Sequence, residues 1–164
     1  MKKEFILALS FFALLFYSCG DKKVSYEEKK AYSTHKDAEF TIDYPTHWMS
    51  EINMHRVAPF VAYSDNQTVR VATRLIEDVS LDSFVNERIE NFEIIYSGFN
   101  LISKEVKGDE AIIRYYTVDE NAPKIETTMK ILKGKEHFYG ADCSYDNEAQ
   151  KDTVEHIISS FKLR

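Results

Sequence analysis

The segment Phe40–Trp48 (FTIDYPTHW) indicates where the folded part of the chain begins and how it starts. Polar and apolar residues alternate from Glu39 to Tyr44, as they do in a strand with one buried face. Pro45 ends this strand, because proline has no N–H group to donate to a neighbouring strand. The segment therefore predicts a domain of residues 38–164 that opens with a strand and a corner at Trp48.

Two more strand-like runs follow this corner, at residues 57–63 and 68–76. In the second run the valine and leucine side chains share one side, because successive side chains of a strand point to opposite faces. Arg70 and Arg74 fall on the other side, where they are candidates for contact with an anionic group. The simpler interpretation is that they form the solvent side of an edge strand.

Two later segments have the three- and four-residue spacing of amphipathic helices. The first begins after Ser80, which is suited to cap a helix N-terminus, and ends at Ser97-Gly98. The second is expected to be capped by Asp146. The predicted buried stripes are Leu81, Phe84, Val85, Ile89, Phe92 and Ile95 in the first helix, and Val154, Ile157, Ile158 and Phe161 in the second.

Two pairs of strand-like runs lie between the helices, and each pair is joined by a short connection that contains glycine. Residues 101–106 and 111–118 flank Gly108, and residues 126–132 and 136–144 flank Gly134. This arrangement predicts two β-hairpins. The order of strands, helix, hairpins and helix predicts an α+β fold, in which an antiparallel sheet is sandwiched by two main helices.

Upstream of the domain, the chain has the pattern of an export signal. Lys2 and Lys3 precede about 13 almost entirely apolar residues, fewer than the roughly 20 that a membrane span needs. Ser18 and Cys19 follow, and this pairing resembles the lipobox of bacterial lipoproteins. Residues 1–18 are therefore predicted to be a signal peptide, with Cys19 lipidated. The alternatives are an ordinary cleaved signal peptide with an incidental cysteine and an uncleaved N-terminal anchor.

Residues 19–37 are mixed in charge and poor in apolar side chains, so they are predicted to be a polar tether. Gly20 stands where an aspartate usually retains lipoproteins at the inner membrane. An outer-membrane location is therefore expected, facing the periplasm or the cell surface. The formal net charge of −6 disfavours nucleic acid as a partner. The expected partners are the membrane, through the lipid, and an envelope protein complex or a small ligand.

Three segments together resemble PsbP-like domains. They are Phe40–Trp48, Val79–Phe84 (VSLDSF) and Ile157–Leu163 (IISSFKL), and the resemblance runs over residues 38–164. It implies an α/β/α sandwich of the kind found in lumenal photosystem proteins and in bacterial secreted proteins and lipoproteins. It also implies a non-enzymatic binding or assembly role, with no catalytic residues to transfer. The chain departs from the family pattern at Thr46-His47, where a small residue or glycine usually precedes the tryptophan.

Aromatic residues are dense for a domain of this size. One interpretation is a recess for a ligand or a partner's side chain near Trp48, lined also by Tyr44 and Tyr63, with His47 and His55 at its rim. The other is core and sheet packing, in which aromatic residues are common. The five histidines lack the spacing of a zinc site, so no metal and no cofactor are expected.

The sequence contains no nucleophile elbow and no glycine-rich phosphate loop. Cys143 is interpreted as a small buried thiol rather than a nucleophile. The sequence therefore favours a lipid-anchored envelope lipoprotein with a non-catalytic binding or accessory role. The alternatives are a small periplasmic hydrolase-like enzyme, with a site assembled from dispersed residues, and a structural interaction module without a pocket.

Overall fold

The computed structural model describes residues 31–52, 58–65, 67–76, 79–120 and 123–164. The predicted signal peptide, Cys19 and most of the predicted tether lie outside these residues, as does His55. Within the described ranges, no helix has the length and apolar character needed to cross a membrane.

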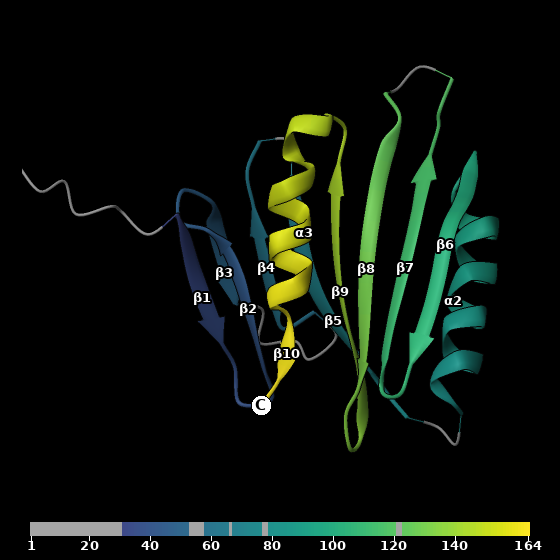
Figure 1. Cartoon of the computed structure of the whole chain (residues 1–164), viewed down its shortest axis with the longest axis horizontal. Coiled ribbons are helices and arrows are strands. Elements are labelled where there is room, and N and C mark those ends of the chain that lie inside the picture. The colour runs from purple at the N-terminus through teal and green to yellow at the C-terminus, as the bar shows by residue number, and fades with distance from the viewer. Residues whose placement is uncertain (1–30, 53–57, 66, 77–78, 121–122) are drawn as a thin grey trace, which may run out of the picture.

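A seven-stranded antiparallel sheet forms the body of the molecule (Figure 1). Its strands lie in the order β3-β4-β5-β9-β8-β7-β6. The two predicted hairpins, β6–β7 and β8–β9, are confirmed. The bounds of the strands are Met49–Ile52 (β3), Phe60–Tyr63 (β4), Thr68–Leu75 (β5), Phe99–Lys107 (β6), Glu110–Thr117 (β7), Ile125–Lys133 (β8) and His137–Tyr145 (β9).

A second, three-stranded sheet has the order β1-β2-β10. It consists of β1 (Tyr32–Lys36), β2 (Phe40–Pro45) and β10 (Lys162–Leu163). The prediction of a single sheet was therefore incomplete, and the assignment of residues 32–36 to the tether was wrong. The reason is aromatic packing, because the ring of Tyr32 lies 3.9 Å from that of His156, and the ring of His35 lies 4.1 Å from that of Phe60.

Both predicted helices are present, α2 (Leu81–Ile95) and α3 (Lys151–Ser160). The cap of the first is confirmed, because Ser80 Oγ accepts a hydrogen bond from the Ser83 N–H at 3.1 Å. The predicted cap at Asp146 is wrong. Asn147 takes that role for a short 3₁₀ turn, Glu148–Gln150, which leads into α3. Ile95, expected to be buried, is 68% exposed at the end of α2.

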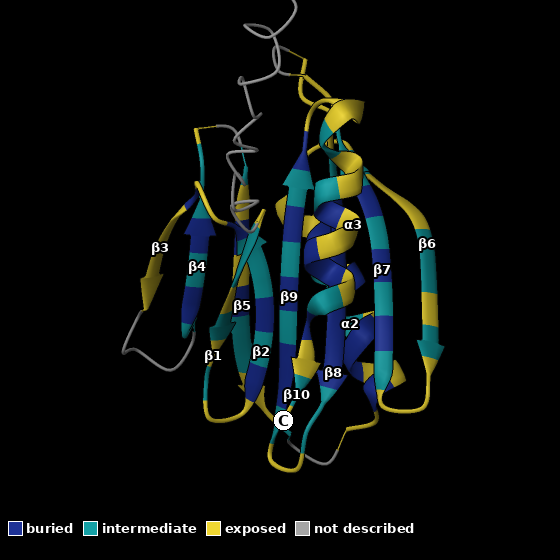
Figure 2. Ribbon diagram, turned by 60° about the vertical axis from the view of Figure 1, so that its left-hand side comes forward, coloured by how far each residue is buried: buried dark blue, intermediate teal, exposed yellow. Residues whose placement is uncertain are grey.

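Each face of the large sheet carries its own apolar core. Along β9, Tyr139, Ala141 and Cys143 pack with residues of α3, whereas Phe138 packs with residues of α2. Figure 2 shows buried residues recurring along β9, β8 and β7. The main contacts of α2 are with β6 and β7, and those of α3 are with β2, β9 and β8. The face that α2 packs on is therefore less fully covered towards β9 and β5.

Candidate functional site

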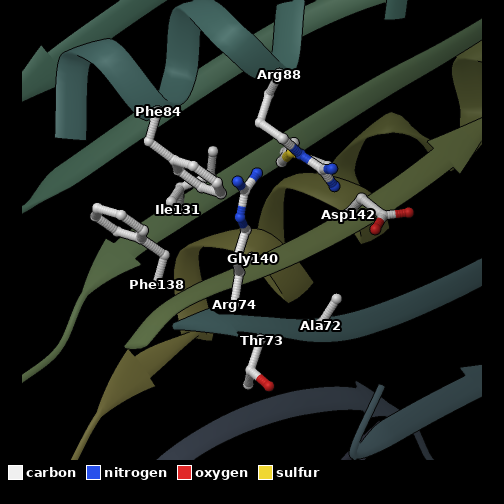
Figure 3. A pocket seen from close by; sticks show the side chains of 10 residues that line it. Ala72, Thr73, Arg74, Phe84, Arg88, Ile131, Phe138, Gly140 and Asp142 are labelled. Atoms are coloured by element: carbon white, nitrogen blue, oxygen red, sulfur yellow. The ribbon is translucent and has the colours of Figure 1, made fainter. Parts of the chain in front are cut away.

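A groove lies beside α2, over the faces of β5 and β9. It encloses about 260 Å³, and Figure 3 shows the side chains that surround it. We call it the α2 groove. Its lining residues come from α2 (Phe84, Arg88), β5 (Ala72, Thr73, Arg74), β8 (Met129, Ile131) and β9 (Phe138, Gly140, Asp142).

The floor of the α2 groove is apolar. Phe84 of α2 stacks on Phe138 of β9 with their ring centroids 4.3 Å apart, and Met129 and Ile131 are buried beside them. Gly140 opens the space above the sheet, because a Cβ atom placed there would meet no other atom within 4 Å. The groove therefore exists because a central strand carries a residue without a side chain at the point where α2 no longer covers it.

Ion pairs form part of the groove's rim. Arg74 Nη1 lies 2.7 Å from Glu87 Oε1, and the Arg74 guanidinium stands over the Phe84 ring, 5.5 Å from its centroid. Arg70 Nη2 lies 3.2 Å from Asp142 Oδ1. Burial raises the pKa of the Asp142 carboxyl, against the opposing charges of Arg70 and Arg88. The acidic side chains at this rim thus each have an arginine partner.

Arg88 differs from the other arginines at the rim. Its guanidinium lies 5.4 Å from the centroid of the Phe92 ring, and among the described residues no carboxylate lies within ion-pair distance of it. Figure 3 shows Arg88 and Arg74 extending into the groove from α2 and β5. The arrangement thus presents guanidinium donors beside an apolar floor, which suits an anionic group attached to an apolar body.

The sequence located part of this site. Arg70 and Arg74 do share one face of β5, as their spacing required. Arg74 lines the groove, and Arg70 forms an ion pair with Asp142, which also lines it. Sequence reasoning missed Arg88, although it stands four residues after Phe84, in step with the apolar stripe of α2. It also missed Gly140, which stands between Phe138 and Asp142 on that face of β9.

The residues predicted to form an aromatic recess near Trp48 differ in how far they are buried. Trp48 is only 6% exposed and belongs to the core that α3 covers, whereas His47 is exposed. Tyr44 is half-buried, with its ring 5.5 Å from that of Phe60. The structure thus gives Trp48 a packing role.

Tyr63 is the other described residue of the predicted recess, and its side chain contacts β3. Its hydroxyl donates a 2.8 Å hydrogen bond to Glu51, which raises the pKa of Tyr63. His55 lies outside the described residues.

One serine, histidine and aspartate do lie close together, where β2 meets α3. His156 Nε2 is 3.3 Å from Asp43 Oδ2, and the Asp43 N–H donates to Ser160 Oγ at 2.8 Å. The Ser160 hydroxyl donates in turn to the carbonyl of Ile157 at 2.6 Å. Because its proton is held by a helix carbonyl, Ser160 is arranged to join β2 to α3 rather than to act as a nucleophile.

Within the part of the chain that the structure describes, no group of three or more His, Cys, Asp and Glu side chains is placed to hold a metal ion. Cys143 is fully buried, and burial raises the pKa of its thiol to about 12. A thiol of this kind has little thiolate at neutral pH and little access to a substrate.

We expect Cys143 to resist alkylation in the folded protein. In the Cys19→Ala variant, which leaves Cys143 as the sole thiol, iodoacetamide at pH 8 should modify the native chain at least about a hundredfold more slowly than the urea-unfolded chain. Mass spectrometry of timed samples measures both rates. Similar rates in the two states would mean that the thiol is accessible, and would restore Cys143 as a candidate nucleophile.

Comparison with known proteins identifies a similar fold among solved structures but no match at the level of sequence. No protein-family model and no curated protein sequence matches the chain. The solution structure of cyanobacterial PsbP (CyanoP) from Synechocystis sp. superposes with a TM-score of 0.65 at 15% identity, covering 90% of this chain and 98% of that one. A Pseudomonas aeruginosa protein of unknown function, described as a putative regulator, gives a TM-score of 0.48 at 13% identity, covering 74% of this chain and 87% of that one. The resemblance predicted from Phe40–Trp48 and the two later segments is thus confirmed at the level of structure, and the chain has a PsbP-like fold.

Proposed function

We propose that the chain is a lipid-anchored lipoprotein of the bacterial envelope, and that its domain binds a small ligand or an envelope partner without catalysing a reaction. The N-terminal pattern of two lysines, an apolar run and Ser18-Cys19 supports the anchor. The helices α2 and α3, each packed on its own face of the sheet, fit the α/β/α sandwich that the resemblance implies.

The character of the α2 groove carries this proposal. It combines an apolar floor with a few polar groups, as ligand sites commonly do. Those polar groups include arginines and a carboxylate paired with Arg70. These features support a site that holds a molecule with an apolar part and a polar part.

The anchor is tested by expressing the full chain in a bacterium that processes lipoproteins. We expect a mature form that begins at residue 19, carries a diacyl or triacyl group by intact mass, and remains in the membrane fraction. Cys19→Ala should lose the lipid and the membrane retention, because acyl chains supply the membrane affinity. Cys143→Ala is the matched control, since it removes the other cysteine of the chain and should keep both properties. A soluble, lipid-free mature form of the unmodified chain would refute the anchor.

The edge strand β3 favours a second candidate, the interaction module. All four of its residues are exposed, including Met49 at 60% and Ile52 at 71%. An exposed edge strand offers unpaired backbone groups to a strand of another protein. In that case a partner would pair with β3 and leave the α2 groove unused.

A further inference from the structure

We propose that the α2 groove binds a small organic anion, with a carboxylate or similar head group against Arg88 and Arg74 and an apolar body over Gly140. This inference rests on the proposed binding function and assigns its ligand class. The floor of the groove supports the apolar body. The stacked rings of Phe84 and Phe138, together with Met129 and Ile131, form a floor that favours apolar contact.

Gly140 sets where that body lies. It stands in a central strand between β5 and β8, opposite Ala72 and Ile131. Its backbone does not have a positive φ, and open space lies where a Cβ atom would be. Backbone conformation therefore does not require glycine here, and glycine in a strand is less favourable than a β-branched residue. The absence of a side chain instead leaves room for an apolar group of a ligand.

The head group is assigned from the charges. The charged residues that line the groove are Arg74, Arg88 and Asp142, so its basic side chains outnumber its acidic ones in a chain of net charge −6. Arg70 holds Asp142, and Arg74 holds Glu87. Arg88 has no such partner among the described residues, and its guanidinium can donate two parallel hydrogen bonds to a carboxylate.

The size of the groove limits the ligand. Its volume of about 260 Å³ is below the roughly 300–1,000 Å³ of pockets that hold drug-sized molecules. A polymer would not fit inside it. A bare inorganic anion would leave the apolar floor uncovered, so a compact aryl or short acyl carboxylate fits the described surface best.

The inference is tested by calorimetry on the full chain in a mild detergent, with 3-phenylpropionate as the probe. The neutral 3-phenylpropionamide has the same apolar body, and inorganic phosphate has a charge without that body. We expect saturable binding of the carboxylate that is at least about tenfold tighter than that of the amide or of phosphate, because hydrogen bonds to a charged group are the stronger ones. Arg88→Met should weaken the binding of 3-phenylpropionate at least about tenfold. The matched control is Arg114→Met, an arginine of β7 that lines a cavity beside α3, and it should leave binding unchanged.

Gly140→Val provides the independent test of position. Its side chain should fill the groove, abolish binding and leave the unfolding temperature equal or higher, since nothing obstructs the new Cβ atom and valine favours strands. Binding that persists in Gly140→Val would place the ligand elsewhere and overturn the inference.

The probes also separate this inference from the proposed function. Equal affinity for the amide and the carboxylate would refute an anionic ligand, but it would still support the proposed binding function. Phosphate bound as tightly as the carboxylate would refute the apolar body. No saturable binding of any probe to the folded, lipidated chain would overturn the ligand class, whereas the anchor depends only on the Cys19→Ala result.

Discussion

Replacing Gly98 by alanine is expected to lower the free energy of unfolding by about 3 kcal/mol. Gly98 lies between α2 and β6 with a φ of +67°, a conformation that residues with a side chain rarely adopt. A Cβ atom at this position would also overlap the carbonyl oxygen of Val118. That contact cannot move freely, because the Val118 N–H donates to the Gly98 carbonyl at 3.2 Å. Urea denaturation followed by circular dichroism measures the loss.

Gly108→Ala is the matched control for this prediction. Gly108, in the β6–β7 turn, has a φ of +60°, yet a Cβ atom there would meet nothing within 4 Å. Gly108→Ala should therefore lower the free energy of unfolding by only about 1 kcal/mol, the cost of the backbone strain. If the two variants lost the same stability, the backbone at Val118 would have to yield to the new methyl group. The proposed close packing of the two segments would then be wrong.

Ile157→Ala should also have a large effect, a loss of about 3 kcal/mol in the free energy of unfolding. Ile157 is completely buried, in the core that joins α3 to both sheets. Its truncation removes apolar contacts and leaves a cavity that close-packed neighbours fill only in part. The midpoint of urea unfolding should fall without a change in the slope of the transition.

Ile95→Ala is the corresponding control, because it deletes the same atoms from a helix residue that is 68% exposed. Its effect should stay within about 0.5 kcal/mol. The periodicity of the sequence placed both isoleucines in buried stripes, so the two variants also test the structural correction at Ile95. A loss at Ile95 as large as that at Ile157 would mean that another surface covers the end of α2.

The helices and hairpins could be predicted because their signals are local. A capping serine and an apolar stripe identify α2, and Gly108 and Gly134 mark the two connections. The position of Ile95 could not be predicted, because periodicity shows which side of a helix is apolar and not where its covering sheet ends.

Pairing between strands that are far apart in the sequence was harder to predict. Residues 32–36 are mostly polar, and β10 has only two residues, so neither shows the alternation expected of a strand. Their pairing depends on β2, which lies close to β1 in sequence and far from β10. The division of the strands into two sheets follows from these pairings and has no local sequence signal.

The candidate site was predictable on one side only. Strand alternation placed Arg70 and Arg74 on one face, as the structure has them. The groove itself depends on how far α2 extends across the sheet towards Gly140, which is a property of tertiary packing. Trp48 shows the same limit, since a tryptophan at a corner suits a ligand recess and a core equally well until its neighbours are known.

The pairing of β2 with β10 has a kinetic consequence. Thr41 lies opposite Lys162, and the Arg164 N–H donates to the carbonyl of Glu39 at 3.0 Å, so segments more than a hundred residues apart complete one small sheet. Closing so long a loop is slow compared with forming a hairpin between neighbours. During synthesis on the ribosome, β6–β7 and β8–β9 can form while β2 still lacks its second neighbour. The pairing of β2 with β10 is therefore expected to form later than the two hairpins.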